Sequence, residues 1–188
     1  MLIHAISTGS MSRTGFVKAA GMAAPWLDAV HLREPDWSEA ATIRTSAEWR
    51  LDTTLLINAK TPGAQKSASG LHLPEPVPFH RKMAGRSVHS PEAAIKAEQE
   101  GATYVIAGPF RNPLSKQVNS ILGRKGLEDI CQSVKIPVIA VGGIQQGMLS
   151  EVMDTGAAGI AVISAVFKSD DPARAAYELR EEAMTCST

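Results

Sequence analysis

Short runs of β-branched and other apolar residues recur along the chain, separated by stretches with helical periodicity or loop-like composition. This alternation is typical of βα units that build a parallel sheet. Eight such runs are present, at residues 2–6, 29–33, 54–58, 70–73, 85–89, 103–107, 137–141 and 159–163. Because eight parallel strands can close on themselves, the pattern predicts a (β/α)8 barrel, the TIM-barrel fold of the α/β class.

Helical periodicity is present at residues 15–24, 37–50, 91–100, 127–134, 146–155 and 172–184. Ser90 and Asp171 each precede a proline, an arrangement that places a capping side chain just before the first helical position. Gly101 and Gly156 stand where a left-handed residue would end a helix. These signals predict helices between most of the strands.

The chain has 188 residues, which is short for a barrel that takes about 250 residues and about 200 at the short end. The stretches 59–69 and 74–84 only just reach the roughly 10 to 12 residues that a parallel crossover needs. We therefore expect a single domain over residues 1–188, with shortened crossovers after strands three and four. A five-stranded doubly wound sheet is the alternative, but it leaves three strand-like runs without a place.

Charge and composition narrow the classes of partner. Lys plus Arg is 19 and Asp plus Glu is 19, so the formal charge cancels and no long-range field favours nucleic acid. No apolar run approaches the roughly 18 residues that span a bilayer, which argues against a membrane partner. The first residues read as a strand without a charged leader, and we expect a cytoplasmic protein.

In a barrel of this kind, ligands bind at the carboxyl ends of the strands, and phosphate favours the loops after strands seven and eight. Gly142 and Gly143 follow the seventh strand, where glycine amides could approach an oxyanion closely, and Ser164 adds a hydroxyl after the eighth. We predict phosphate binding at these three residues. The alternative is that the paired glycines form only a tight turn.

Five segments recur in order at barrel spacing. They read HLRE at 31–34, LIN at 56–58, GRSVHSPEAA at 85–94, IPVIAVGGI at 136–144 and GAAGIAVIS at 156–164. Together they resemble the thiamine phosphate synthase/TenI superfamily over nearly the whole chain. The resemblance implies one of two activities: joining a pyrimidine pyrophosphate to a thiazole phosphate, or isomerising a carboxythiazole phosphate to its aromatic tautomer.

Departures from the family pattern bear on the choice between the two. The synthases carry aspartates that hold Mg²⁺ and pyrophosphate at positions where this chain has Ala59, Lys60 and Pro76. The tautomerases carry a histidine where this chain has Pro109, in a Gly-Pro turn that is synthase-like. The missing aspartates favour a TenI-like thiazole tautomerase, an isomerase of thiamine biosynthesis that needs no metal and no cofactor. A non-catalytic ligand-binding or regulatory relative and a thiamine phosphate synthase, a transferase, are the alternatives.

The resemblance also indicates which side chains contact the substrate. Arg33 closes the second strand, where its guanidinium could bind a carboxylate or phosphate in bidentate fashion. Asn58, Ser87 and Lys116 match substrate-contacting positions of the family, with solvated strand-end residues as the alternative. The expected partner is a small-molecule thiazole phosphate, and the family implies a homodimer.

A proton-transfer group must replace the missing family histidine if the chain is a tautomerase. His72 and His31 are predicted to point into the barrel, and histidine exchanges protons near neutral pH. We expect His72 to be the catalytic group and His31 the second candidate. For both, the alternative is a hydrogen-bonded packing role inside the barrel.

Overall fold

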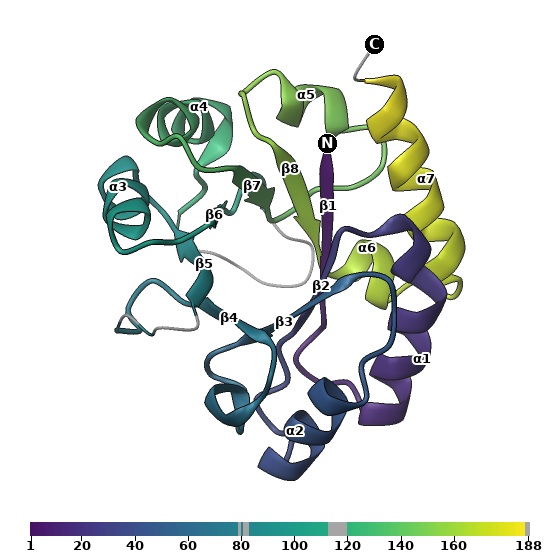
Figure 1. Ribbon diagram of the computed structural model, residues 1–188. Coiled ribbons are helices and arrows are strands. Elements are labelled where there is room, and N and C mark those ends of the chain that lie inside the picture. The colour runs from purple at the N-terminus through teal and green to yellow at the C-terminus, as the bar shows by residue number, and fades with distance from the viewer. Residues whose placement is uncertain (79, 81–82, 113–119, 187–188) are drawn as a thin grey trace.

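The computed structural model describes residues 1–78, 80, 83–112 and 120–186 and confirms the predicted barrel. Eight strands pair in parallel and in chain order, and the last one pairs with the first (Figure 1). They are β1 (Leu2–Ile6), β2 (Ala29–Leu32), β3 (Thr54–Asn58), β4 (Gly70–Leu73), β5 (Met83–Val88), β6 (Tyr104–Ala107), β7 (Val138–Val141) and β8 (Gly159–Val162). The competing doubly wound sheet is thereby excluded.

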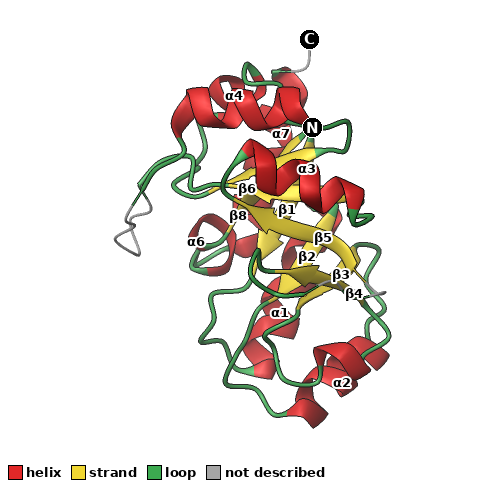
Figure 2. Cartoon of the chain, turned by 90° about the vertical axis from the view of Figure 1, so that its left-hand side faces the viewer, coloured by secondary structure: helices red, strands yellow, loops and turns green. Residues whose placement is uncertain are grey.

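Helices pack around the outside of the barrel (Figure 2). They are α1 (Arg13–Ala23), α2 (Glu39–Ala47), α3 (Pro91–Gln99), α4 (Gly123–Ser133), α5 (Leu149–Met153), α6 (Ser164–Phe167) and α7 (Pro172–Thr185), with 3-10 turns η1 (Ala24–Trp26) and η2 (Ala64–Lys66). All six predicted helices are present, although α2 and α5 are shorter than expected. The four-residue α6 is an addition to the predicted set.

The predicted helix signals act as expected. The Ser90 side chain accepts a hydrogen bond from the amide of Ala93, and Asp171 accepts one from Arg174, so both cap the first turn of a helix. Gly101 and Gly156 have φ values of 89° and 86°, the left-handed conformation that ends a helix at little cost for glycine.

The shortened crossovers are also confirmed. The connection from β3 to β4 contains only the 3-10 turn η2, and no helix lies in the described part of the connection from β4 to β5. In place of a helix there, the Arg86 side chain on the outer face of β5 donates hydrogen bonds to the carbonyl oxygens of Glu75 and Val77, at 2.9 Å and 2.7 Å. In its described part, the connection from β4 to β5 is therefore held to β5 by this side chain rather than by a helix.

Two apolar layers hold the fold together. The larger one lies between the barrel and the surrounding helices. The smaller one fills the barrel interior and consists of Ile6, Ala29, Leu56, Tyr104, Ile106, Ile139 and Ala161. Three histidines share the interior with it, because the alternation of β-strands turns His4, His31 and His72 inward.

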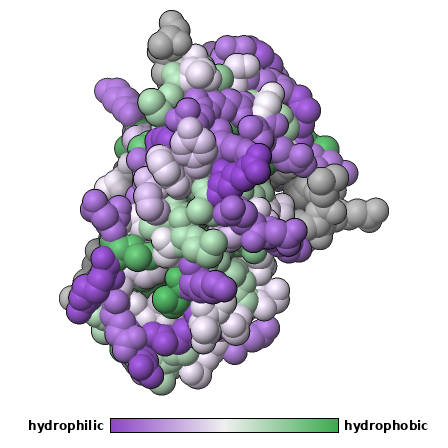
Figure 3. All heavy atoms as spheres, turned by 90° about the vertical axis from the view of Figure 1, so that its right-hand side faces the viewer, coloured by the Kyte–Doolittle hydropathy of each residue, from purple (hydrophilic) through white to green (hydrophobic). Residues whose placement is uncertain are grey.

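The face of the molecule that carries α1 and α7 is mostly hydrophilic, with a few separate hydrophobic spots (Figure 3). Within the described ranges, no helix combines the length and the apolar character that crossing a membrane requires.

Candidate functional site

A cleft of about 840 Å³ opens at the carboxyl ends of the strands. At its inner end lies a smaller pocket of about 140 Å³ between the strand ends, which shares Arg33, Asn58, Ser87, Ile106 and Val141 with the cleft. The pocket walls are completed by Ile6, His31, His72 and Ile163. This is the end of a barrel at which active sites are built.

The structure brings together three of the four predicted substrate-contacting residues. Arg33 follows β2 and is exposed, Asn58 ends β3, and Ser87 lies one residue before the end of β5. The amide oxygen of Asn58 accepts a hydrogen bond from the backbone N–H of Lys60 at 3.0 Å, which orients both residues beside the cleft. Their role in binding stays a prediction. Lys116 lies outside the described residues.

Glu34 is a buried carboxylate next to Arg33 that the sequence pattern did not single out. Its two oxygens accept hydrogen bonds from the amides of Gly9 and Met11, at 3.0 Å and 2.9 Å. These bonds hold the loop after β1 against the end of β2, where Gly9 lies close to the Arg33 guanidinium. Glu34 therefore fixes the loop that borders the site.

The three residues predicted to bind phosphate lie at the same end of the barrel but outside the lining of the cleft. Gly142 has a φ of 97°, and a Cβ at this position would lie 2.6 Å from Cβ of Pro109. Gly143 has a φ of 68°, and a Cβ at this position would lie 2.9 Å from the backbone of Arg111. Tight packing thus accounts for both glycines. Ser164 is exposed at the start of α6, and phosphate binding here stays a prediction.

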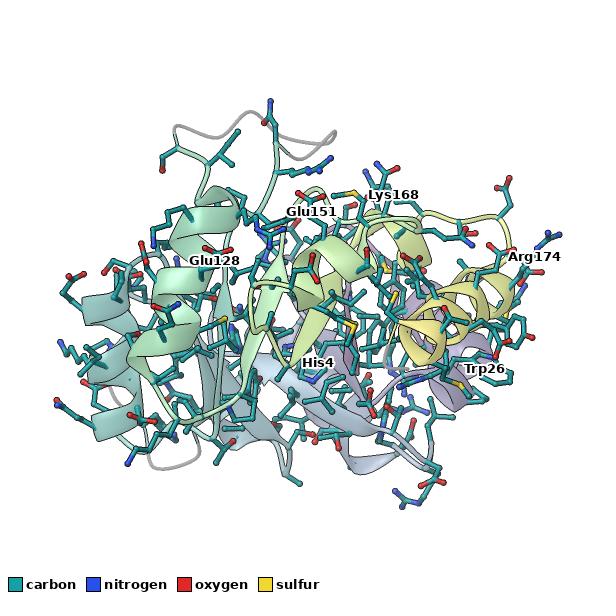
Figure 4. The ribbon with its side chains drawn as sticks, turned by 90° about the horizontal axis from the view of Figure 1, so that it is seen from above. His4, Trp26, Glu128, Glu151, Lys168 and Arg174 are labelled. Atoms are coloured by element: carbon teal, nitrogen blue, oxygen red, sulfur yellow. The ribbon has the colours of Figure 1, made fainter. Side chains whose placement is uncertain are left out.

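The predicted histidines meet inside the barrel. His4 Nδ1 lies 3.1 Å from His31 Nε2, and the ring centroids of His31 and His72 are 5.3 Å apart. Figure 4 shows His4 among the strands, whereas Glu128 and Arg174 lie on peripheral helices. His31 and His72 are 1% and 4% exposed and reach the site only through the inner pocket.

Burial keeps these histidines uncharged. Loss of hydration lowers the pKa of His4 to about 4, against a smaller opposing effect of Asp28. Burial, with the nearby His4 and Arg86, lowers the pKa of His72 to about 3. The pKa of His31 is lowered well below its usual value, first by burial and then by its two histidine neighbours. Their assignment as catalytic groups stays a prediction.

His89 makes a structural hydrogen bond and also lines the cleft. Its Nδ1 lies 2.5 Å from the carbonyl oxygen of Gly108, so Nδ1 carries the proton and donates it. This bond joins the end of β5 to the loop that contains Pro109.

The residues of the cleft do not fit a bound Mg²⁺. Magnesium in proteins is held by carboxylate oxygens, and the positions that carry aspartates in the synthases are Ala59, Lys60 and Pro76. Lys60 and Pro76 line the cleft together with three glutamates, Glu75, Glu92 and Glu100, of which Glu100 is paired with Arg86. In the part of the chain that is described, no three His, Cys, Asp or Glu side chains gather as a metal site would require. Where the synthases have a metal-binding aspartate, this chain has the positively charged side chain of Lys60.

Comparison with known proteins gives the family. Residues 4–166 match the family described as thiamine monophosphate synthase. The thiamine-phosphate synthase of Haloquadratum walsbyi is 34% identical over 180 residues, covering 86% of this chain and 80% of that protein. The synthase of Pyrococcus furiosus is 46% identical over 97 residues, which cover 52% of this chain and 47% of that protein. The chain therefore spans about half the length of that relative.

The solved structures agree. The structure titled thiamine phosphate pyrophosphorylase from Pyrococcus furiosus superposes with a TM-score of 0.80 and 26% identity, covering 100% of this chain and 97% of that one. A 3-hexulose-6-phosphate synthase, at 18% identity and a TM-score of 0.70, shares the fold alone.

These relatives correct the expectation of a tautomerase. Those described above are named for the synthase reaction, and none is named a tautomerase or an isomerase. Pro109 agrees with the correction, because a proline stands where the tautomerases carry their proton-transferring histidine. The match over residues 4–166, with the relatives that cover most of the chain, establishes that this protein belongs to the thiamine monophosphate synthase family.

Proposed function

We propose that the protein is a transferase of the thiamine-phosphate synthase type, which joins a pyrimidine pyrophosphate to a thiazole phosphate in the cleft of the barrel. The observation that carries the proposal is the convergence of Arg33, Asn58, Lys60 and Ser87 on one cleft at the carboxyl ends of β2, β3 and β5. These strand ends are where the family places its substrate contacts.

The charges in the cleft suit the leaving group of such a reaction. A bond forms between the thiazole ring and the carbon of the pyrimidine substrate that carries the pyrophosphate. The bond from that carbon to pyrophosphate breaks, and the departing pyrophosphate takes the electron pair and gains negative charge. The cationic side chains of Arg33 and Lys60 line the cleft mouth, where they would stabilise that charge. Arg86 also carries a positive charge, but it lies 2.8 Å from Glu100 and is already paired.

The apolar part of the inner pocket suits a ring, whereas Arg33, Asn58 and Ser87 lie where the pocket opens to the cleft. The pocket walls include the apolar side chains of Ile6, Ile106, Val141 and Ile163, and polar groups enter from the histidines, Asn58 and Ser87. Apolar walls with a few directional polar groups are typical of sites that orient a flat ring.

The test is a direct assay of the purified protein with both substrates. Release of pyrophosphate and formation of the joined product, followed by mass spectrometry, are expected. Chelation of divalent ions with EDTA should leave turnover in place, because Ala59, Lys60 and Pro76 replace the aspartates of the family. Arg33→Met should lower the rate by about a hundredfold, the usual effect of removing a group that stabilises developing charge. Lys135→Ala, which changes an exposed lysine far along the chain, is the control.

A second candidate is a relative that binds the phosphorylated ligands without joining them. The replacement of the family aspartates by Ala59 and Lys60 favours it. Calorimetry separates the two candidates, because tight binding of thiazole phosphate without any pyrophosphate release, with or without added Mg²⁺, would contradict the transferase proposal.

A further inference from the structure

A line of three polar side chains runs from the barrel interior to the inner pocket and enters the site through Ser87. It starts at Tyr104 on β6, passes through His72 on β4 and ends at Ser87 on β5. The Tyr104 hydroxyl lies 3.1 Å from His72 Nδ1, and His72 Nε2 lies 2.8 Å from Ser87 Oγ. The rings of His72 and Tyr104 stack at a centroid distance of 5.8 Å, tilted by 20°.

Strand register and one glycine make this line possible. His72 is the register partner of Gly85, and Gly85 is the register partner of Tyr104, so the three lie in one layer across adjacent strands. A Cβ at position 85 would lie only 2.2 Å from Cζ of Tyr104. Because Gly85 has no side chain, the Tyr104 ring reaches over β5 to the histidine on β4.

The buried hydroxyl of Tyr104 sets the direction of the hydrogen bonds. Tyr104 is 8% exposed, and His72 Nδ1 is its one hydrogen-bond partner among the described residues. Leaving a buried donor without an acceptor costs about 1–3 kcal/mol. The phenol therefore donates its proton to His72 Nδ1, which must be unprotonated to accept it.

The hydrogen-bond direction set by Tyr104 also determines the direction of the bond between His72 and Ser87. A neutral imidazole holds one proton, so an unprotonated Nδ1 places that proton on Nε2. The Nε2–H group donates to one of the two lone pairs of Ser87 Oγ, so the Ser87 hydroxyl proton cannot point toward His72. The hydroxyl proton of Ser87 is then left to point into the pocket that Ser87 lines.

The protonation states agree with this assignment. Burial lowers the pKa of His72 to about 3, so the imidazole is neutral at ordinary pH. Burial also raises the pKa of Tyr104, so the phenol keeps the proton that it donates.

We propose that Tyr104 fixes His72 as the Nε2–H tautomer and thereby directs the hydroxyl proton of Ser87 to an acceptor atom of the bound ligand. The acceptor is a phosphate or pyrophosphate oxygen, or an unprotonated ring nitrogen. Tyr104 and His72 are positioning residues, because His72 Nε2 cannot take a proton from Ser87 while it holds its own. The assignment of the His72 tautomer is independent of the proposed function. Only the identification of the acceptor atom as part of a synthase substrate rests on that function.

Nuclear magnetic resonance tests the tautomer without any ligand. In protein with ¹⁵N-labelled histidine, the His72 signals, assigned by their loss in His72→Gln, should show an unprotonated Nδ1 and a protonated Nε2. Tyr104→Phe keeps the ring over Gly85 and removes only the hydroxyl, so a second population with the proton on Nδ1 is expected. Tyr177→Phe removes the hydroxyl of an exposed tyrosine on α7 and should change nothing. A wild-type His72 protonated on Nδ1, or a tautomer unaffected by Tyr104→Phe, would overturn the proposal.

Calorimetry with inorganic pyrophosphate then tests the donor role. Ser87→Ala should weaken binding by about tenfold or more, as expected for the loss of a hydrogen bond to a charged group. Tyr104→Phe should also weaken it, but should have no further effect in the Ser87→Ala background, because its influence passes through Ser87. Additive losses in the double variant would overturn the relay. A wild-type protein with the Nε2–H tautomer that fails to bind pyrophosphate would support the tautomer while overturning both the oxyanion as acceptor and the proposed synthase function.

Discussion

Gly142 and Gly101 have nearly the same backbone conformation but different surroundings. Their φ values are 97° and 89°, in the left-handed region that costs a residue with a Cβ about 1–2 kcal/mol. At Gly101 nothing lies within 4 Å of an added Cβ, whereas at Gly142 the rigid ring of Pro109 lies 2.6 Å away. A comparison of substitutions at the two positions therefore separates the cost of backbone strain from the cost of a steric clash.

Gly142→Ala should therefore destabilise the protein by more than Gly101→Ala does. We expect about 1–2 kcal/mol for Gly101→Ala from strain alone. Collision with Pro109 should add about 1–3 kcal/mol to the loss for Gly142→Ala. Chemical denaturation of the two variants measures both values. Equal losses would mean that the loop at Pro109 moves away freely and that packing does not explain Gly142.

On the scale of elements, a single arginine replaces the missing helix after β4. The Arg86 guanidinium is almost fully buried, donates to two loop carbonyl groups and lies 2.8 Å from Glu100 at the end of α3. Its Nε has no hydrogen-bond partner in the part of the chain that the structure describes. The loop after β4 is thus held to β5 and α3 by charge and hydrogen bonds rather than by an apolar helix face.

Arg86→Met should loosen this loop and leave Glu100 without its cation. We expect a loss of about 2–4 kcal/mol in the free energy of unfolding, together with faster hydrogen exchange at the Val77 amide. Arg50→Met is the matched control, because Arg50 also donates to two carbonyl oxygens but is exposed, and it should cost less than about 0.5 kcal/mol. Similar losses in the two variants would show that burial of Arg86 contributes nothing to the loop.

The sequence pattern predicted elements better than it predicted contacts. The strands were found because buried parallel strands are short apolar runs, and the caps because serine, aspartate and glycine act locally. The four-residue α6 is too short to show a helical period. Contacts between strands depend on register, which local periodicity does not fix, so the layer of His72, Gly85 and Tyr104 was not foreseen. A glycine within a predicted strand was the one available signal, since it often marks close approach of another group.

The conformation of the loops at the strand ends was not predicted from the sequence. Arg33, Asn58 and Ser87 meet at the cleft because strand ends converge in any barrel of this kind. Gly142, Gly143 and Ser164 share that end but do not line the cleft, and phosphate binding by these residues stays a prediction. The tautomerase hypothesis gave more weight to the missing aspartates than to the synthase-like turn at Pro109, and the relatives correct that weighting.

For the molecule as a whole, the three buried histidines make the barrel sensitive to mild acid. In the unfolded chain each takes up a proton near pH 6.5, whereas in the folded barrel the pKa of His4 is about 4 and that of His72 about 3. Above about pH 6.5 the histidines are neutral in both states and impose no penalty. As the pH falls below that value, only the unfolded chain gains protons, so stability decreases until the folded-state pKa values are reached.

Lowering the pH from 7 to 5 should therefore reduce the free energy of unfolding by about 2 kcal/mol for each histidine, or up to about 6 kcal/mol for the three together. Chemical denaturation at a series of pH values measures the slope. His4→Gln removes one titrating group while keeping an amide that can hydrogen-bond to His31, so its slope should be about a third smaller even if its stability at pH 7 is lower. A free energy of unfolding that stays constant between pH 7 and 5 would show that these histidines accept protons inside the folded barrel. In that case water would have to reach the layer that contains them.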